Sequence, residues 1–146
     1  MRSIEPSSRR TVLGFVAGVI AVLVFHQGAW AALHLAGLMP PPYPMGATPP
    51  WGVPETLNFC FWGGLWGAAY GLVLPKLPLP AWLSGLMLGV IANLVLWFVV
   101  FPLKGQPVAS GWALRSMLVV LVIHLVWGIG VGVILPMLTV RAPQRA

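Results

Sequence analysis

The stretch that decides the fold reads Phe61-Trp62-Gly63-Gly64-Leu65-Trp66-Gly67-Ala68-Ala69-Tyr70-Gly71-Leu72-Val73-Leu74-Pro75. It is apolar throughout, yet every fourth residue along one line (Gly63, Gly67, Gly71) has no side chain. In water such a glycine-rich segment would be a poor helix. In a lipid bilayer, the backbone must satisfy its own hydrogen bonds, which favours a helix. We therefore predict a transmembrane helix whose glycine line lets a second helix approach closely.

The composition of the whole chain also indicates a membrane protein. Of its 146 residues, 59% are hydrophobic and 7% are charged, whereas soluble domains carry about 25% charged residues. The net charge of +6 comes from Lys and Arg at helix ends and chain termini. We therefore expect the lipid bilayer, and no nucleic acid, as the partner of these cations. The single cysteine, Cys60, excludes an internal disulfide.

Four apolar segments are long enough to cross a bilayer, so we predict an all-α membrane domain over residues 11–138. The expected spans are residues 11–37, 55–74, 81–101 and 112–138. Residues 38–54 contain seven prolines and predict an extended external loop between the first two spans. Basic tails, residues 1–10 and 139–146, flank the domain.

The distribution of positive charge predicts the orientation. Six of the eight Lys and Arg residues fall on the side of the chain termini, namely Arg2, Arg9, Arg10, Lys76, Arg141 and Arg145. Lys104 and Arg115 fall on the other side. Because Lys and Arg accumulate on the cytoplasmic side, we expect both termini in the cytoplasm and a multi-pass protein of the cell inner membrane.

The N-terminal region allows a second interpretation. Ser8-Arg9-Arg10-Thr11 resembles a twin-arginine export signal, and Ala29-Trp30-Ala31 fits a small-residue cleavage site. The apolar run that follows is longer than the core of a signal peptide. We therefore favour a retained first helix.

The sequence also predicts a tandem repeat of a two-helix hairpin. Residues 66–75 align with 127–136 at an offset of 61, and residues 14–24 align with 85–95 at an offset of 71. Helices one and two would then be repeated as helices three and four, related by an axis along the membrane normal. Each helix carries small residues at four-residue spacing, which we expect to mediate packing: Gly14, Gly18, Gly63, Gly67, Gly71, Gly85, Gly89, Gly128 and Gly132.

Three polar residues continue these glycine lines in four-residue steps, namely His26, Asn93 and His124. Polar residues inside a membrane are functional candidates by default, so we take these three as a candidate intramembrane site. A second tier forms a candidate outer mouth: Gln27, His34, Glu55, Asn58 and Arg115. The alternative is structural, because neutral His and Asn can bond to facing carbonyls and clamp helices together. Glu55 and Arg115 would form an ion pair or act as separate snorkelling charges.

The sequence offers little support for chemistry. The chain has no aspartate, and Glu5 and Glu55 are its two carboxylate side chains, so no carboxylate pair is available. No serine lies in a G-x-S-x-G motif, and the His and Cys residues follow no metal-ligand spacing. His26 and His124 could be axial haem ligands, but no C-x-x-C-H motif is present. We expect no enzyme activity, no metal and no cofactor.

Several short strings also suggest a relationship. They are Phe25-His26-Gln27, then Trp30 and His34, the proline-rich loop with Gly52-Val53-Pro54, and Phe61-Trp62-Gly63-Gly64-Leu65-Trp66-Gly67. In these strings the chain resembles a family of uncharacterised small bacterial four-helix inner-membrane proteins. The resemblance implies a bacterial membrane location and brings no assigned activity or ligand.

Three functions are compatible with the sequence. We favour a non-enzymatic accessory or assembly subunit of a larger membrane complex, or a homo-oligomer, because glycine grooves occur without a catalytic constellation. The alternative is a small-solute or proton-coupled transporter or channel, in which His26, Asn93 and His124 line the path. The third is a haem- or quinone-binding redox membrane protein.

Overall fold

The computed structural model describes residues 7–140, and four long helical runs dominate them. The first span, Ser7–Leu35, comprises α1 (Ser7–Ala21), the π-helical η1 (Val22–His26) and α2 (Gln27–Leu35). The second, Glu55–Lys76, comprises α3 (Glu55–Val73) and η2 (Leu74–Lys76). The third, Ala81–Leu103, comprises α4 (Ala81–Val95), the π-helical η3 (Leu96–Val100) and α5 (Phe101–Leu103). The fourth is α6 (Leu114–Thr139), preceded by the short turn η4 (Val108–Trp112).

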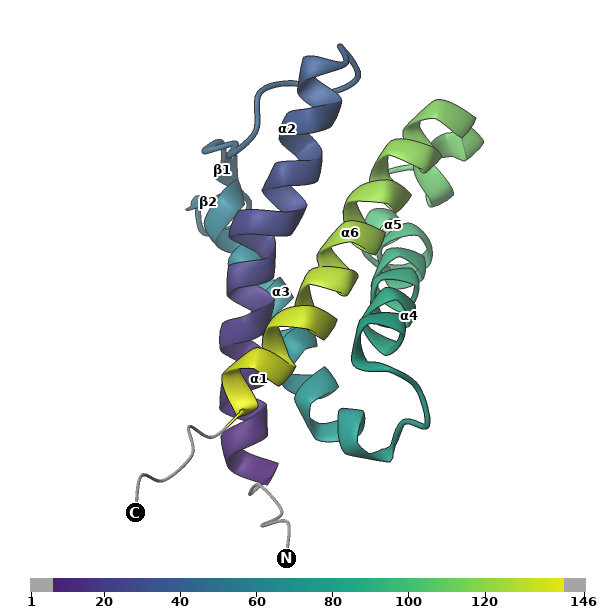
Figure 1. The fold of residues 1–146 in the computed structure, drawn as a ribbon. Coiled ribbons are helices and arrows are strands. Elements are labelled where there is room, and N and C mark those ends of the chain that lie inside the picture. The colour runs from purple at the N-terminus through teal and green to yellow at the C-terminus, as the bar shows by residue number, and fades with distance from the viewer. Residues whose placement is uncertain (1–6, 141–146) are drawn as a thin grey trace, which may run out of the picture.

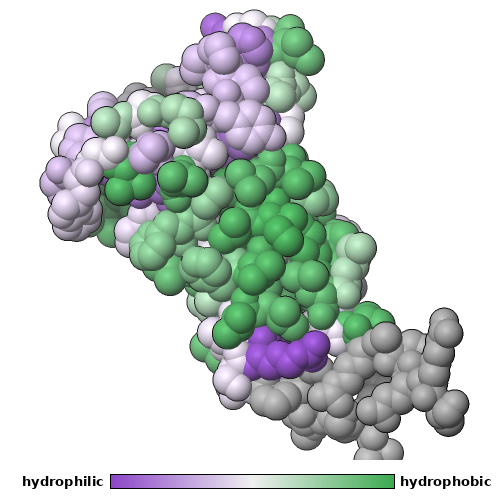
Figure 2. Space-filling model, turned by 90° about the vertical axis from the view of Figure 1, so that its left-hand side faces the viewer, coloured by the Kyte–Doolittle hydropathy of each residue, from purple (hydrophilic) through white to green (hydrophobic). Residues whose placement is uncertain are grey.

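All four runs are long and apolar enough to cross a membrane. The prediction of an all-α, four-span membrane protein is therefore confirmed. Figure 2 shows a hydrophobic band on one face of the molecule, with hydrophilic residues gathered above it and a small hydrophilic patch below it. A bilayer would surround this band, because its exposed apolar side chains are more favourably placed in lipid than in water.

Glycines in the left-handed region end the first and third spans. At Gly37 (φ +73°) the amide donates to the carbonyl of His34, and the amide of Leu38 donates to the carbonyl of Leu33. Gly105 (φ +69°) ends the third span with the same pair of bonds. This is the Schellman motif, in which glycine accepts the positive φ without a steric penalty.

The helices pack as two hairpins. The first span lies along α3, α4 lies along α6, and the two hairpins meet mainly where α1 contacts α6 (Figure 1). The Trp127 indole N–H donates to the Gly18 carbonyl across this central contact (3.3 Å). We call the end of the bundle where α1 begins, α6 ends and α3 is linked to α4 the terminal end, and the opposite end the loop end.

α3 and α4 have few contacts with each other. The hydrogen bonds that join them lie close to the terminal end. There, the buried Tyr70 hydroxyl donates to the Ala81 carbonyl (2.8 Å) and lies 2.7 Å from Ser84 Oγ. From this junction toward the loop end, the two helices have few mutual contacts. This arrangement leaves room between them.

The proline-rich loop folds back along the first span. It contains a two-residue antiparallel pairing of β1 (Ala47–Thr48) with β2 (Val53–Pro54). The Trp30 indole donates to the Pro40 carbonyl (2.9 Å), and the Tyr43 hydroxyl donates to the Leu23 carbonyl (2.8 Å). The loop is therefore fixed to the helix by side chains of both segments.

Candidate binding groove

A cavity of about 470 Å³ lies between α3 and α4 and is open along one side. We call it the α3–α4 groove. α3 forms one wall, α4 and η3 form the other, and side chains of η1 and α6 form the floor. Both π-helical segments contribute lining residues, and π-helical turns inside α-helices are often found at functional sites. Because the groove separates two membrane spans, its open side faces the region that lipid would occupy.

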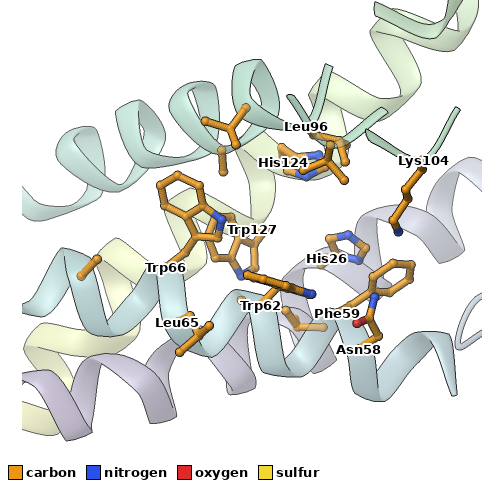
Figure 3. Close-up of a pocket in the computed structure, with 16 residues that line it drawn as sticks. His26, Asn58, Phe59, Trp62, Leu65, Trp66, Leu96, Lys104, His124 and Trp127 are labelled. Atoms are coloured by element: carbon orange, nitrogen blue, oxygen red, sulfur yellow. The ribbon is translucent and has the colours of Figure 1, made fainter. Parts of the chain in front are cut away.

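The groove has a polar end and an aromatic end. Lys104, directly after the third span, and Asn58, near the start of α3, line it at the loop end. Trp66 and Trp127 line it farther toward the terminal end, with Trp62 between the two groups (Figure 3). From Asn58 to Ala69, the last α3 residue that lines the groove, the helix rises by about 16 Å. The groove is therefore long, mostly apolar and cationic at one end.

His26 and His124 meet in the floor of the groove. Their ring centroids are 6.0 Å apart and the rings are inclined at 77°. His26 also packs against the rings of Phe59 (5.4 Å) and Trp30 (6.0 Å). His26 Nδ1 lies 3.4 Å from Gln27 Nε2, and His124 Nδ1 lies 2.9 Å from the Val120 carbonyl oxygen of its own helix. Within residues 7–140, neither histidine has a hydrogen bond to a facing helix, so these bonds do not clamp helices together.

Asn93, the third member of the candidate intramembrane site, does not line the groove. It is fully buried, and within residues 7–140 neither its amide nitrogen nor its amide oxygen has a hydrogen-bond partner. It continues the line of Gly85 and Gly89, which packs against the α6 backbone. The structure thus brings the two histidines together and places Asn93 outside the groove.

The residues expected at the outer mouth take different positions. Asn58 lines the groove, whereas Gln27 and His34 hold the proline-rich loop. Arg115 donates to the Gly37 carbonyl (3.4 Å), and the Glu55 amide donates to the Gly46 carbonyl. No ion pair joins Glu55 and Arg115 in the described part of the chain.

Sequence reasoning missed Lys104 as a lining residue, because the charge pattern marked it only as a cation on the loop side. The available signal was its position directly after the last residue of an apolar span. A cation there lies at the membrane surface, where a cavity between that span and its neighbour would open. Trp62 and Trp66 lie in the second expected span, but the sequence does not show whether they face a cavity or another helix.

No family model, curated protein or solved structure matches the chain. The expected resemblance is therefore not supported by a family assignment. What stands is a small multi-pass membrane protein with four apolar helices.

The side-chain amide of Asn93 has no hydrogen-bond partner in the described chain, which leads to a prediction about stability. Replacing Asn93→Leu removes two unpartnered polar atoms from an apolar interior and is expected to leave the free energy of unfolding unchanged or raise it by about 1 kcal/mol. The measurement is thermal unfolding in detergent micelles. Ser84→Ala is the matched control: Ser84 is equally buried on α4, but its hydroxyl has partners, so its loss should lower the melting temperature. A larger loss for Asn93→Leu than for Ser84→Ala contradicts the prediction.

Proposed function

We propose that this chain is a non-enzymatic integral membrane protein that binds one amphiphile with an anionic headgroup in the α3–α4 groove. The observation that supports this proposal is the groove itself. It is aromatic along most of its length, open toward the side of the molecule, and lined at the loop end by Lys104 and Asn58. Ligand sites are typically apolar cavities with a few convergent polar groups.

The charge at the loop end favours an anionic headgroup. Lys104 is the cationic residue among those that line the groove, and no carboxylate lines it within residues 7–140. An ammonium group binds phosphate or carboxylate oxygens as a point charge, and the Asn58 amide adds hydrogen-bond capacity.

The apolar part of the groove suits a hydrocarbon chain. Its length along α3 of about 16 Å is close to half of the roughly 30 Å hydrocarbon thickness of a bilayer. A lipid-like ligand would therefore keep its headgroup at the membrane surface and its tail at its usual depth. Because the groove opens sideways, such a molecule can enter from the surrounding leaflet without crossing water.

The lysines provide the test. The chain has two, Lys104 in the groove and Lys76 in η2 at the terminal end. We expect native mass spectrometry from nanodiscs of equal phosphatidylglycerol and phosphatidylcholine to show retained phosphatidylglycerol for the wild type and for Lys76→Gln. Lys104→Gln is expected to reduce this preference by up to about fivefold, because Lys104 is exposed and a solvent-exposed ion pair contributes about 1 kcal/mol or less. Equal retention by both variants contradicts the proposal.

A second variant tests the groove rather than the charge. Val95→Trp places a large side chain in the open groove and is expected to displace the retained lipid while the protein stays folded. The same spectra report any co-purifying subunit or second copy of the chain. They therefore also test the hypothesis of an accessory subunit or homo-oligomer.

We favour binding over transport or catalysis. A transport path would have to continue beyond Trp66 and Trp127 to the terminal end, where Tyr70 joins α3 to α4. A hydrolytic site would need a nucleophile or carboxylate beside the two histidines, and the groove-lining residues include neither.

We also propose that the two hairpins are tandem copies. In each hairpin, the two helices approach so closely at three places that a Cβ added to a glycine would overlap a backbone carbonyl of the partner helix. In the first hairpin these pairs are Gly14–Gly67, Gly18–Gly63 and Arg10–Gly71, and in the second they are Gly85–Gly128, Gly89–His124 and Ala81–Gly132. Adding 71 to the first-span number and 61 to the α3 number converts each pair into its counterpart. Packing through small residues at four-residue spacing is a known mode of membrane helix association.

The location follows from charge. We propose the inner membrane of a bacterium, with the terminal end in the cytoplasm, because six of eight Lys and Arg residues belong to that end. Of these six, Arg2, Arg141 and Arg145 lie outside the described residues. The groove mouth at Lys104 then opens in the outer leaflet.

A further inference from the structure

The hydrogen bonds around His26 and His124 assign their tautomers, and from these we infer the class of ligand. We infer that the α3–α4 groove recognises an anionic amphiphile that carries a hydroxyl group on its chain. The hydroxyl would be bound by His26 as donor and His124 as acceptor. The inference rests on the proposed function for the groove as a binding site, but the tautomers can be measured without any ligand.

The tautomer of His26 is set by the proline-rich loop. The Tyr43 backbone N–H donates to one side-chain atom of Gln27 at 2.7 Å, which identifies that atom as the carbonyl oxygen. The other end of the amide is therefore the NH₂ group, and it lies 3.4 Å from His26 Nδ1. An NH₂ group can only donate, so His26 Nδ1 accepts and the ring proton sits on Nε2.

The tautomer of His124 is the opposite one. Its Nδ1 lies 2.9 Å from the Val120 carbonyl oxygen, which can only accept. Nδ1 therefore carries the proton, and Nε2 of the neutral ring keeps its lone pair. Because no carboxylate lines the groove in the described chain, protonating both rings would place two cations 6.0 Å apart without a counter-ion.

Both Nε2 atoms are available to a ligand. Within residues 7–140, neither has a hydrogen-bond partner, and neither is among the unpartnered atoms that are fully buried. Both rings line the same groove, and Figure 3 shows them between its polar and aromatic ends. One N–H donor and one lone-pair acceptor thus face one cavity.

A hydroxyl group satisfies both Nε2 atoms with hydrogen bonds. Its oxygen accepts from the His26 Nε2–H, and its O–H donates to the lone pair of His124 Nε2. An ether or quinone oxygen only accepts and would leave the His124 lone pair unsatisfied. His26 packs against Phe59, the residue directly after Asn58 (ring centroids 5.4 Å), so the imidazoles lie next to the polar end of the groove. A headgroup at Lys104 therefore places the hydroxyl on the part of the chain that is close to the headgroup.

The first experiment measures the tautomers by ¹⁵N NMR of histidine-labelled protein in detergent micelles. The chain has three histidines, and His34 Nδ1 lies 2.9 Å from the Met39 carbonyl oxygen. We expect His34 and His124 to carry their proton on Nδ1 and His26 alone to carry it on Nε2. Gln27→Glu replaces the NH₂ donor by a carboxylate oxygen and is expected to move the His26 proton to Nδ1 while the His34 signals stay in place. A wild-type His26 protonated on Nδ1 overturns the inference.

The second experiment titrates three matched probes: stearate with a hydroxyl on its chain near the carboxylate, the methyl ether of that alcohol, and plain stearate. We expect the hydroxylated probe to shift the Nε2 signals of both His26 and His124, and the ether to shift only that of His26. Equal shifts with the ether and the alcohol would mean that a bridging water serves the two rings, which overturns the hydroxyl specificity. Binding of plain stearate that depends on Lys104, without any advantage for the hydroxylated probe, overturns this inference and leaves the proposed function standing. No binding of any probe contradicts both.

Discussion

Gly67→Ala is expected to lower the free energy of unfolding by more than about 4 kcal/mol, among the largest effects of a single methyl group. A Cβ at this position would overlap the Gly14 carbonyl and lie 3.0 Å from the Gly18 backbone. Backbone atoms of two packed helices cannot move independently, so the first span and α3 must separate. The measurement is thermal unfolding in detergent micelles, together with the monodisperse fraction after purification.

Gly28→Ala is the matched control for this variant. Gly28 is also helical, in α2, but a Cβ there meets nothing within 4 Å. Because alanine is the better helix former by about 1 kcal/mol, this change should be neutral or stabilising. Gly128→Ala, the counterpart in the second hairpin, is expected to cost as much as Gly67→Ala. If the Gly67→Ala variant had the same melting temperature as the Gly28→Ala variant, α1 and α3 would not pack through their backbones.

Trp127→Ala is expected to cost about 3 kcal/mol, at the low end of the range for removing a core tryptophan. Trp127 is 3% exposed and bonds to the Gly18 carbonyl, so it fills the contact between the two hairpins. The value lies at the low end because lipid is as apolar as the protein interior, so little hydrophobic transfer free energy is lost. The cost then comes mainly from the cavity and from lost dispersion contacts. The expected readouts are a lower melting temperature and a weaker hold on lipid in the groove.

Trp62→Ala separates stability from binding. Trp62 lines the same groove but is 54% exposed, so its removal should change the free energy of unfolding by less than about 1 kcal/mol. It is nevertheless expected to weaken lipid retention, because its ring forms part of the wall. Equal loss of stability in the two variants would contradict the assignment of Trp127 to the hairpin interface.

The sequence was informative about the histidines and less so about their neighbours. Four-residue steps from the glycine lines pointed to His26 and His124, and these two do meet. The same steps pointed to Asn93, which lies outside the groove because its helix line packs directly on α6. A line of small residues marks the side that contacts another helix, but not whether that contact is closed or opens into a cavity.

What the sequence by itself determined is the four-span, all-α membrane protein, because hydropathy, proline positions and glycine spacing act over a few residues and the bilayer removes most alternatives. Only the tertiary structure decided the groove, since it depends on α3 and α4 joining at Tyr70 and losing contact beyond it. Tertiary structure also decided the place of Lys104 and the bond from Tyr43 to Gln27 that orients His26. These features join residues far apart in the chain, and no local pattern encodes the angle at which two hairpins cross.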